Sequence, residues 1–122
     1  MAKLWSERDT GEIAIPKRWM RVKQGGEVDR ITSTIRREPF RKIVAREKTV
    51  EYRAIKPYWT RKLTLVRTPF LLRIINGMTH PIPEATVVVT RLHKNTKLRQ
   101  YELHLGPVRA VKHWDRRRGQ PR

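Results

Sequence analysis

Hydrophobic and polar residues alternate along most of this chain, in short segments separated by turn-forming residues. Alternation with a period of two, combined with β-branched residues, is typical of strands. It predicts strands at residues 30–36, 48–53, 67–75, 85–92 and 100–113. We expect the last of these to be interrupted near Gly106-Pro107. The pattern therefore indicates about five strands.

Between the first two predicted strands the period changes to that of a helix. Pro39 opens a segment in which Phe40, Ile43 and Val44 form one apolar stripe, surrounded by basic residues. Residues 57–59 predict a turn or a short helical connection. Five strands with one or two helices indicate a mostly β (α+β) fold. We predict a small, mostly antiparallel β-barrel with a helix beside a cleft, because closing a barrel hides the edges of the sheet.

The composition indicates one domain. The chain has 122 residues, of which 38% are hydrophobic, and this suffices for one modest core. We predict an N-terminal extension at 1–29, a β-barrel domain at 30–115 and a basic C-terminal tail at 116–122. No apolar run approaches the length of about 18 residues that spans a bilayer. We therefore expect a cytoplasmic protein without a membrane partner.

The residue content alone argues against several classes of enzyme and metal site. Cysteine is absent, which excludes disulfides, thiolate zinc sites and cysteine nucleophiles. The four histidines are scattered without metal-ligand spacing, and the sequence contains neither a nucleotide-binding glycine loop nor a serine-hydrolase motif. We predict no metal and no cofactor, and the oligomeric state is left open.

The strongest compositional feature is positive charge. The net charge is +18, and residues 31–122 carry 22 basic and six acidic side chains. Such an excess favours a polyanionic partner whose phosphates release counterions on binding. We expect phosphate contacts from residues in a basic block at 36–62 and in the tail, namely Arg36, Arg37, Arg41, Lys42, Arg116, Arg117 and Arg118. Genome composition, solubility and an anionic membrane surface are the alternative explanations.

Polar chemistry concentrates on the strand that follows the basic helix. On a strand, Thr49, Glu51 and Arg53 share one face, while Val50 and Tyr52 share the other. We expect the side chains of Val50 and Tyr52 to pack in the core. The other face then offers a hydroxyl, a carboxylate and a guanidinium to a cleft. A solvated Glu51–Arg53 ion pair is the alternative.

These groups suit a nucleobase and its phosphate. Lys48 stands at the mouth of the strand, and with Glu51 and Arg53 it could hydrogen-bond a base edge and clamp a phosphate. Tyr58 and Trp59 follow soon after and could stack on the base. Packing of both aromatic rings in the core is the alternative.

The stretch from Ile31 to Leu63 resembles the ASCH domain, the activating-signal-cointegrator homology family of the PUA-like superfamily. The family signature is glycine, any residue, lysine, two residues, glutamate, one residue and arginine. Lys48, Glu51 and Arg53 match it, and Arg46 occupies the glycine position. Further similar segments lie downstream, so that the likeness covers about residues 30–115.

The resemblance implies a β-barrel with a helix beside a cleft, and RNA binding. Our first hypothesis is a module that holds single-stranded or looped RNA. Some family members are ribonucleases or hydrolyse the amide of acetylated cytidine, so the alternative is a metal-independent hydrolase in which Lys48, Glu51 and Arg53 are catalytic. The nucleophilic threonine of the amidohydrolase branch would fall at Glu51. Reading of double-stranded DNA is less favoured, because no recognition-helix pattern is visible.

Overall fold

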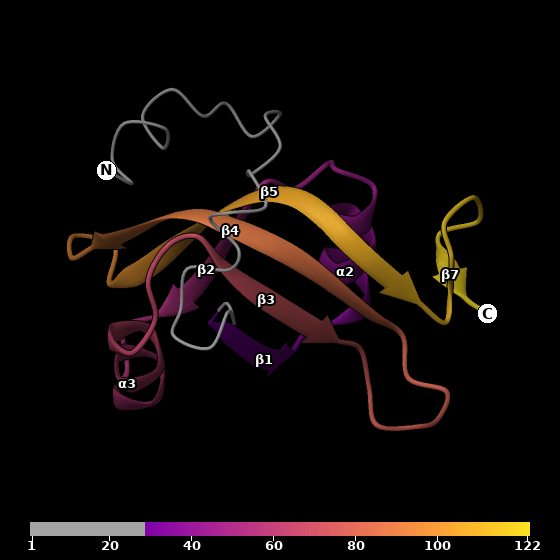
Figure 1. Cartoon of the computed structure of the whole chain (residues 1–122), viewed down its shortest axis with the longest axis horizontal. Helices are drawn as coiled ribbons and strands as arrows, with labels where there is room; N and C mark the ends of the chain where they lie inside the picture. Colours follow the sequence, from indigo (N-terminus) through magenta and orange to yellow (C-terminus); the bar gives the residue numbers. More distant parts are fainter. Residues whose placement is uncertain (1–28) are drawn as a thin grey trace.

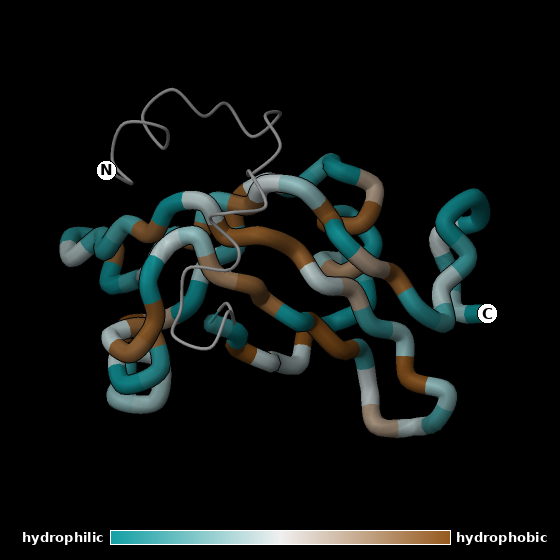
Figure 2. Tube along the Cα trace, in the orientation of Figure 1, coloured by the Kyte–Doolittle hydropathy of each residue, from teal (hydrophilic) through white to brown (hydrophobic). Residues whose placement is uncertain are grey.

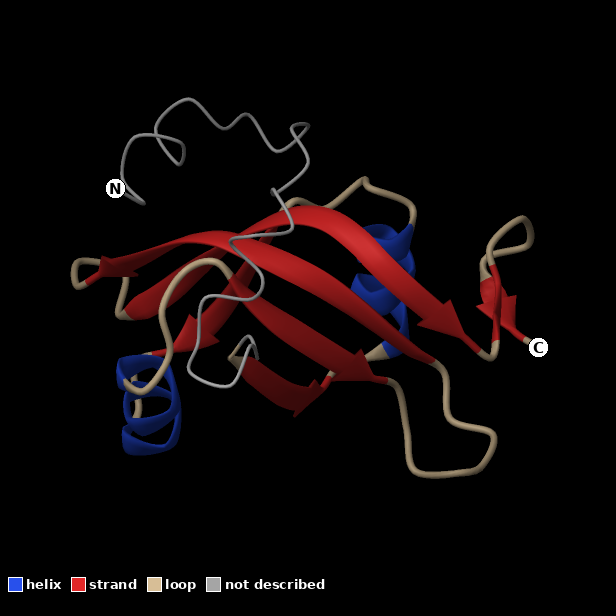
Figure 3. Cartoon of the chain, in the orientation of Figure 1, coloured by secondary structure: helices blue, strands red, loops and turns tan. Residues whose placement is uncertain are grey.

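The computed structural model describes residues 29–122, which form a curled, five-stranded sheet with two helices. The elements are β1 (Arg30–Thr34), α2 (Arg37–Val44), β2 (Val50–Ala54), α3 (Pro57–Thr64), β3 (Phe70–Ile75), β4 (Glu84–Asn95), β5 (Gln100–Lys112), β6 (Trp114–Asp115) and β7 (Gln120–Pro121). Figure 1 shows the sheet bent into a half-barrel, and Figure 3 shows the helices toward its two ends. The predicted fold class, a small and mostly β barrel-like fold with helices, is confirmed.

The strand order is β1-β3-β4-β5-β2, so β1 and β2 are the two edges of the sheet. The pairs β3–β4, β4–β5 and β5–β2 are antiparallel, whereas β1 and β3 are parallel. That pair is parallel because the chain crosses over through α2, β2 and α3 before it returns as β3. The two edge strands do not pair with each other, and the barrel remains open between them.

The helix α2 covers the core with the apolar stripe that the sequence predicted. Phe40, Ile43 and Val44 are buried together with inward residues of β3, β4 and β5. Hydrophobic residues follow these strands through the middle of the molecule (Figure 2). The helix begins at Arg37 rather than at the predicted Pro39. Proline is tolerated in the first turn because the N–H that it lacks would have no partner within the helix there.

The longest strand, β5, is continuous, so the predicted interruption near Gly106 and Pro107 was wrong. The pairing of β4 with β5 instead shifts register at three places, between Thr86 and Arg91 of β4. Such bulges absorb residues that do not fit a regular ladder and bend the strands. The irregularity therefore curls the sheet without ending the strand.

Gly106 is expected to be intolerant of any side chain. A Cβ atom at this position would lie 2.7 Å from Cγ2 of Thr90 on the neighbouring strand. We expect Gly106→Ala to lower the free energy of unfolding by about 1–3 kcal/mol through overpacking, as measured by urea denaturation. Thr90→Ser removes that methyl group, so the double variant should regain part of the loss. Strictly additive losses would contradict this explanation.

The residues after β5 fold back as a two-stranded hairpin, in which Trp114 pairs with Pro121. The hairpin therefore spans the predicted boundary between the domain and the tail at 116–122. The predicted N-terminal extension at 1–29 lies, apart from Asp29, outside the described residues. Neither helix found within residues 29–122 has the length and apolarity that crossing a membrane requires.

Candidate nucleic-acid interface

The inward face of β2 is the polar one. In the antiparallel register with β5, Glu51 is opposite Leu103, whereas Tyr52 is opposite Glu102. Paired residues share a face of the sheet, so Glu51 points inward with the buried Leu103. Glu51 is 6% exposed and Tyr52 is 49% exposed.

The expectation that Val50 and Tyr52 feed the core was therefore wrong, since Val50 is only half-buried and Tyr52 is exposed. The physical reason is the position of β2 at the open edge of the half-barrel. Its inward side chains border the gap to β1 rather than a closed apolar interior. Polar groups are stable there only when they are paired.

Glu51 is paired on both of its oxygens. Its Oε1 lies 3.2 Å from Nζ of Lys48, and its Oε2 lies 2.7 Å from a terminal nitrogen of Arg53. The side chains of Lys48 and Arg53 are 27% and 18% exposed, so the contacts are shielded from water. The Glu51–Arg53 ion pair, which was the alternative to an open cleft face, is therefore formed, but it is shielded rather than solvated. We call these three residues the ion triad.

Arg53 also connects the two edges of the sheet. The nitrogen that contacts Glu51 donates to the carbonyl oxygen of Thr34 on β1, at 3.4 Å. The guanidinium carbon lies 5.0 Å from the centre of the Trp59 ring. Cation–π contacts of this kind orient the planar guanidinium. Arg53 is therefore held from three sides at the opening of the half-barrel.

Two adjoining hollows lie at this opening. The first, which we call the cleft, has a volume of about 500 Å³ and is lined by β2, the end of β1 and the start of α2. The second, the aromatic hollow, has a volume of about 390 Å³ and is lined by Tyr58, Trp59 and residues of β1 and β3. Thr34 and Arg53 border both. The two hollows together form a site with cations, a carboxylate and flat rings.

One donor in this site lacks an acceptor. Nε of Arg53 is buried and makes no hydrogen bond with any part of the chain that the structure describes. Buried polar atoms are nearly always hydrogen-bonded in proteins, so an unpaired N–H carries a cost. Arg53 borders both hollows, but this N–H is itself closed to solvent, so a ligand acceptor reaches it only when the Arg53 side chain turns.

The site brings together five of the residues predicted from the sequence, which are Arg36, Glu51, Arg53, Tyr58 and Trp59. Tyr58 and Trp59 stand edge to face, with ring centres 5.7 Å apart. Tyr58 is half-exposed, whereas Trp59 packs partly against the core. Core packing, the alternative for both rings, therefore holds in part for Trp59, whereas Tyr58 leaves about half of its surface exposed.

Lys48 and Thr49 do not line either hollow. Lys48 supports Glu51 and lies with Nζ 5.4 Å from the centre of the Tyr52 ring. Thr49 precedes β2, is exposed and receives a hydrogen bond from Leu105 N–H on its backbone oxygen. The predicted common cleft face of Thr49, Glu51 and Arg53 was therefore wrong for Thr49.

The other predicted phosphate ligands lie away from the cleft. Arg37 donates from Nε to Asn76 Oδ1 at 3.2 Å, and Lys42 is exposed. Arg41 donates to Glu38, and this hydrogen bond lowers the pKa of the Glu38 carboxyl below its ordinary value. Arg41 also lines a different hollow together with Arg116, Arg117 and Arg118. The basic residues therefore form two separate groups.

The sequence did not single out several residues that line the cleft, which are Thr34, Ile35, Pro39 and Ala54. Ala54 follows Arg53 in the chain, whereas Thr34, Ile35 and Pro39 become neighbours of Arg53 only because β1 and β2 meet without pairing. No local pattern signals that geometry. Residues 29–122 also contain no cluster of three or more histidine, aspartate or glutamate side chains suited to a metal ion.

Comparisons with known proteins assign this chain to no family. No protein-family model matches it, and no curated protein matches it significantly.

Proposed function

We propose that this protein binds single-stranded or looped RNA in the cytoplasm, with one nucleobase held at the cleft and the aromatic hollow. The single observation that carries the proposal is the setting of Arg53. Its guanidinium is clamped by Glu51 at 2.7 Å and lies over Trp59, while its Nε–H is buried without an acceptor. An oxygen or ring nitrogen of a base would supply that acceptor once the Arg53 side chain turns toward the cleft.

The surroundings of Arg53 supply the other contacts that a nucleotide needs. Tyr58 is exposed beside Arg53 and offers a face for stacking, which contributes about 1–3 kcal/mol per base. Arg36 borders the cleft and is exposed, so its guanidinium can take the adjoining phosphate. The excess of basic over acidic residues in 31–122 supports a polyanion as the partner.

We also propose that the domain is of the ASCH type. The three signature residues Lys48, Glu51 and Arg53 are joined in the ion triad, which gives their spacing a physical purpose. Arg46 stands at the glycine position of the signature and has a φ of 65°. That left-handed conformation favours glycine, so the backbone at this position retains the geometry for which a glycine is suited.

The binding proposal is tested with fluorescence anisotropy of labelled oligoribonucleotides. We expect Arg36→Ala, Tyr58→Ala and Arg53→Lys each to weaken binding about tenfold, since each removes about 1.4 kcal/mol or more of contact energy. Arg53→Lys keeps the charge but loses the planar fork and Nε. Lys97→Ala, on the exposed β4–β5 turn, is the control and should bind as the wild type does.

Two results would contradict the proposal. One is equal affinity for RNA and for a sulfated polyanion such as heparin, which would indicate charge attraction without a base site. The other is wild-type affinity in all three cleft variants. Chemical-shift mapping with free nucleosides should in addition centre on the residues around Arg53.

A hydrolase remains the second candidate, favoured by the carboxylate of Glu51 at the wall of the cleft with Lys48 at 3.2 Å. A carboxylate beside an ammonium group can serve acid–base catalysis. Purified protein is incubated with labelled RNA and with acetylated cytidine. Turnover that is lost in both Lys48→Ala and Glu51→Gln would establish the enzyme, whereas turnover that survives both changes would come from elsewhere.

A further inference from the structure

A second basic surface surrounds the C-terminal hairpin, at the opposite end of α2 from the cleft. Two hollows of about 380 and 460 Å³ meet there and share Trp114, Arg116 and Arg117. We call this region the hairpin surface. Its arginines are Arg41 of α2, Arg46 in the turn after α2, Arg109 of β5, and Arg116, Arg117, Arg118 and Arg122 of the hairpin and the residue that follows it.

The carboxylates that line the hairpin surface are already engaged. Asp115 Oδ1 accepts the backbone N–H groups of Arg117 and Arg118, at 3.0 and 3.1 Å, and thereby closes the turn of the hairpin. Glu47 lies 3.6 Å from a terminal nitrogen of Arg41. These carboxylates are the only acidic residues among those that line the two hollows.

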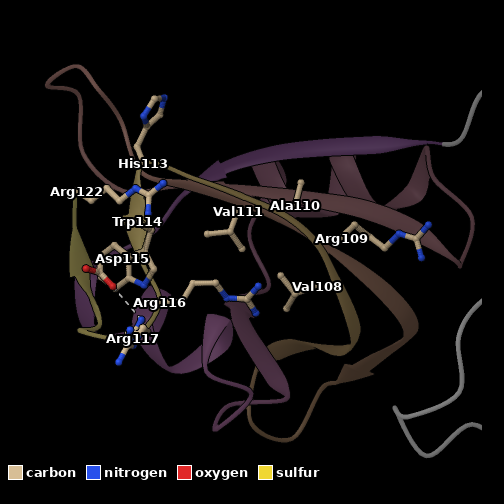
Figure 4. A pocket seen from close by; sticks show the side chains of 10 residues that line it. All are labelled: Val108, Arg109, Ala110, Val111, His113, Trp114, Asp115, Arg116, Arg117 and Arg122. Carbon is tan, nitrogen blue, oxygen red and sulfur yellow. Dashed lines mark hydrogen bonds between the residues drawn. The ribbon is translucent and has the colours of Figure 1, made fainter.

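Four guanidinium groups of the hairpin surface therefore stay uncompensated. Within the part of the chain that the structure describes, the side chains of Arg109, Arg116, Arg117 and Arg122 form neither an ion pair nor a side-chain hydrogen bond. In Figure 4, Arg116 extends along the hollow toward Val108. Positive charges that line adjoining hollows repel one another, and an anion bound between them offsets that repulsion.

The hairpin is anchored to the body of the protein. The Trp114 ring is buried and meets Phe40 of α2 edge-on, with ring centres 4.8 Å apart. Gly119 donates its N–H to the carbonyl of Asp115 at 2.8 Å and lies close against the Arg41 side chain. The arginines are thus presented on a positioned scaffold, so binding orders fewer chain segments than it would on a free tail.

We propose that the hairpin surface is a second binding site, which holds backbone phosphates of the RNA strand whose base occupies the cleft. This inference rests on the proposed function. Arginine suits the role because its planar fork matches two phosphate oxygens. Contacts to the backbone position a strand without reading its sequence, so this site adds affinity and not base selectivity.

The helix α2 joins the two sites. Arg36 and Pro39, at its start, border the cleft, whereas Arg41 and Val44, near its end, border the hairpin surface. A helix of eight residues is about 12 Å long, at 1.5 Å per residue. About four stacked nucleotides, at 3.4 Å each, cover the same length. One short strand can therefore occupy both sites along α2.

The test uses the full chain with Arg116, Arg117 and Arg118 all replaced by alanine. Alanine retains the backbone N–H groups that Asp115 caps, so the hairpin should remain folded. Anisotropy is recorded with a labelled oligoribonucleotide of about 12 nucleotides and with a nucleoside monophosphate. For the oligonucleotide we expect affinity to fall about tenfold or more, and the slope of log K against log salt to decrease by about 2, at 0.7 per phosphate. Affinity for the monophosphate should not change.

The matched control removes the same number of charges at the other end of the molecule. Arg91, Lys94 and Lys97 are exposed on the second half of β4 and its turn to β5, and that turn lies at the opposite end of the molecule from β7 in Figure 1. Their triple alanine variant should keep most of the affinity and slope for the oligonucleotide. An equal loss in this control would overturn the inference, because it would reflect net charge alone.

The remaining outcomes separate this inference from the proposed function. If the Arg116/Arg117/Arg118 variant retains wild-type affinity and salt slope while the cleft variants bind more weakly, the hairpin site is overturned and the proposed base site at the cleft stands. If the hairpin variant loses RNA affinity while the cleft variants bind as the wild type does, the base site at the cleft is overturned and a phosphate site at the hairpin stands. A hairpin variant that loses binding to phosphatidylserine vesicles but keeps RNA binding overturns the inference in favour of a membrane surface.

Discussion

Replacing Glu51 by alanine is expected to lower the free energy of unfolding by about 3 kcal/mol. The change leaves the charges of Lys48 and Arg53 partly buried without their carboxylate. Removing one partner of a buried ion pair is costly because the charge of the other partner stays desolvated. Small domains are stable by only about 5–15 kcal/mol, so the loss should be plain in urea denaturation followed by circular dichroism.

A double-mutant cycle separates the ion triad from the loss of side-chain volume. Arg53→Met keeps much of the aliphatic stem, and in the Glu51→Ala background it should cost less than in the wild type. The coupling between Glu51 and Arg53 is expected at about 1–3 kcal/mol. Additive effects would contradict a functional contact at 2.7 Å. Lys97→Ala, which is exposed, provides the baseline of about 0.5 kcal/mol or less.

Trp114→Ala is expected to destabilise the protein by about 3–5 kcal/mol and to release the hairpin from α2. The ring is 4% exposed and packs edge-on against the fully buried Phe40. Truncation leaves a cavity at this contact and removes the anchor of β6 and β7. Urea denaturation measures the loss of stability, and amide hydrogen exchange should show faster exchange at residues 115–120.

The same variant links the stability of the hairpin to RNA binding. If Trp114 positions the arginines of the hairpin surface, Trp114→Ala should lower the salt dependence of oligonucleotide binding although every arginine remains. Trp114→Phe retains an aromatic ring next to Phe40 and should be milder in both measurements. Unchanged exchange and an unchanged salt slope in Trp114→Ala would show that the hairpin holds its place without this residue.

Elements with a clear period were predictable from the sequence because they follow local rules. The stripe of Phe40, Ile43 and Val44 is buried as its helical spacing requires. The first two predicted strands, at 30–36 and 48–53, correspond to β1 and β2 with ends shifted by one or two residues. Both properties depend on neighbours within a few positions, where side-chain direction repeats with a fixed period.

The inward face of β2 was not predictable in this way. Alternation determines that Glu51 and Arg53 share a face, but it does not decide whether that face points inward or outward. The register with β5 decides it, because Glu51 lies opposite the buried Leu103 and Tyr52 lies opposite Glu102. Apolar residues usually occupy the inward face. Here the carboxylate of Glu51 faces inward, and its contacts with Lys48 and Arg53 offset the cost of burying it.

By itself the sequence determined the mostly β fold class, the apolar face of α2, the positive charge and the spacing of the ion-triad residues. These depend on composition and on short-range periodicity. Only the tertiary structure decided that β1 and β2 meet without pairing, that Arg53 reaches Thr34 across 19 positions of the chain, and that Trp114 docks the basic hairpin on Phe40. Such contacts join residues that are distant in the chain, and their formation depends on how the whole sheet curls rather than on any local pattern.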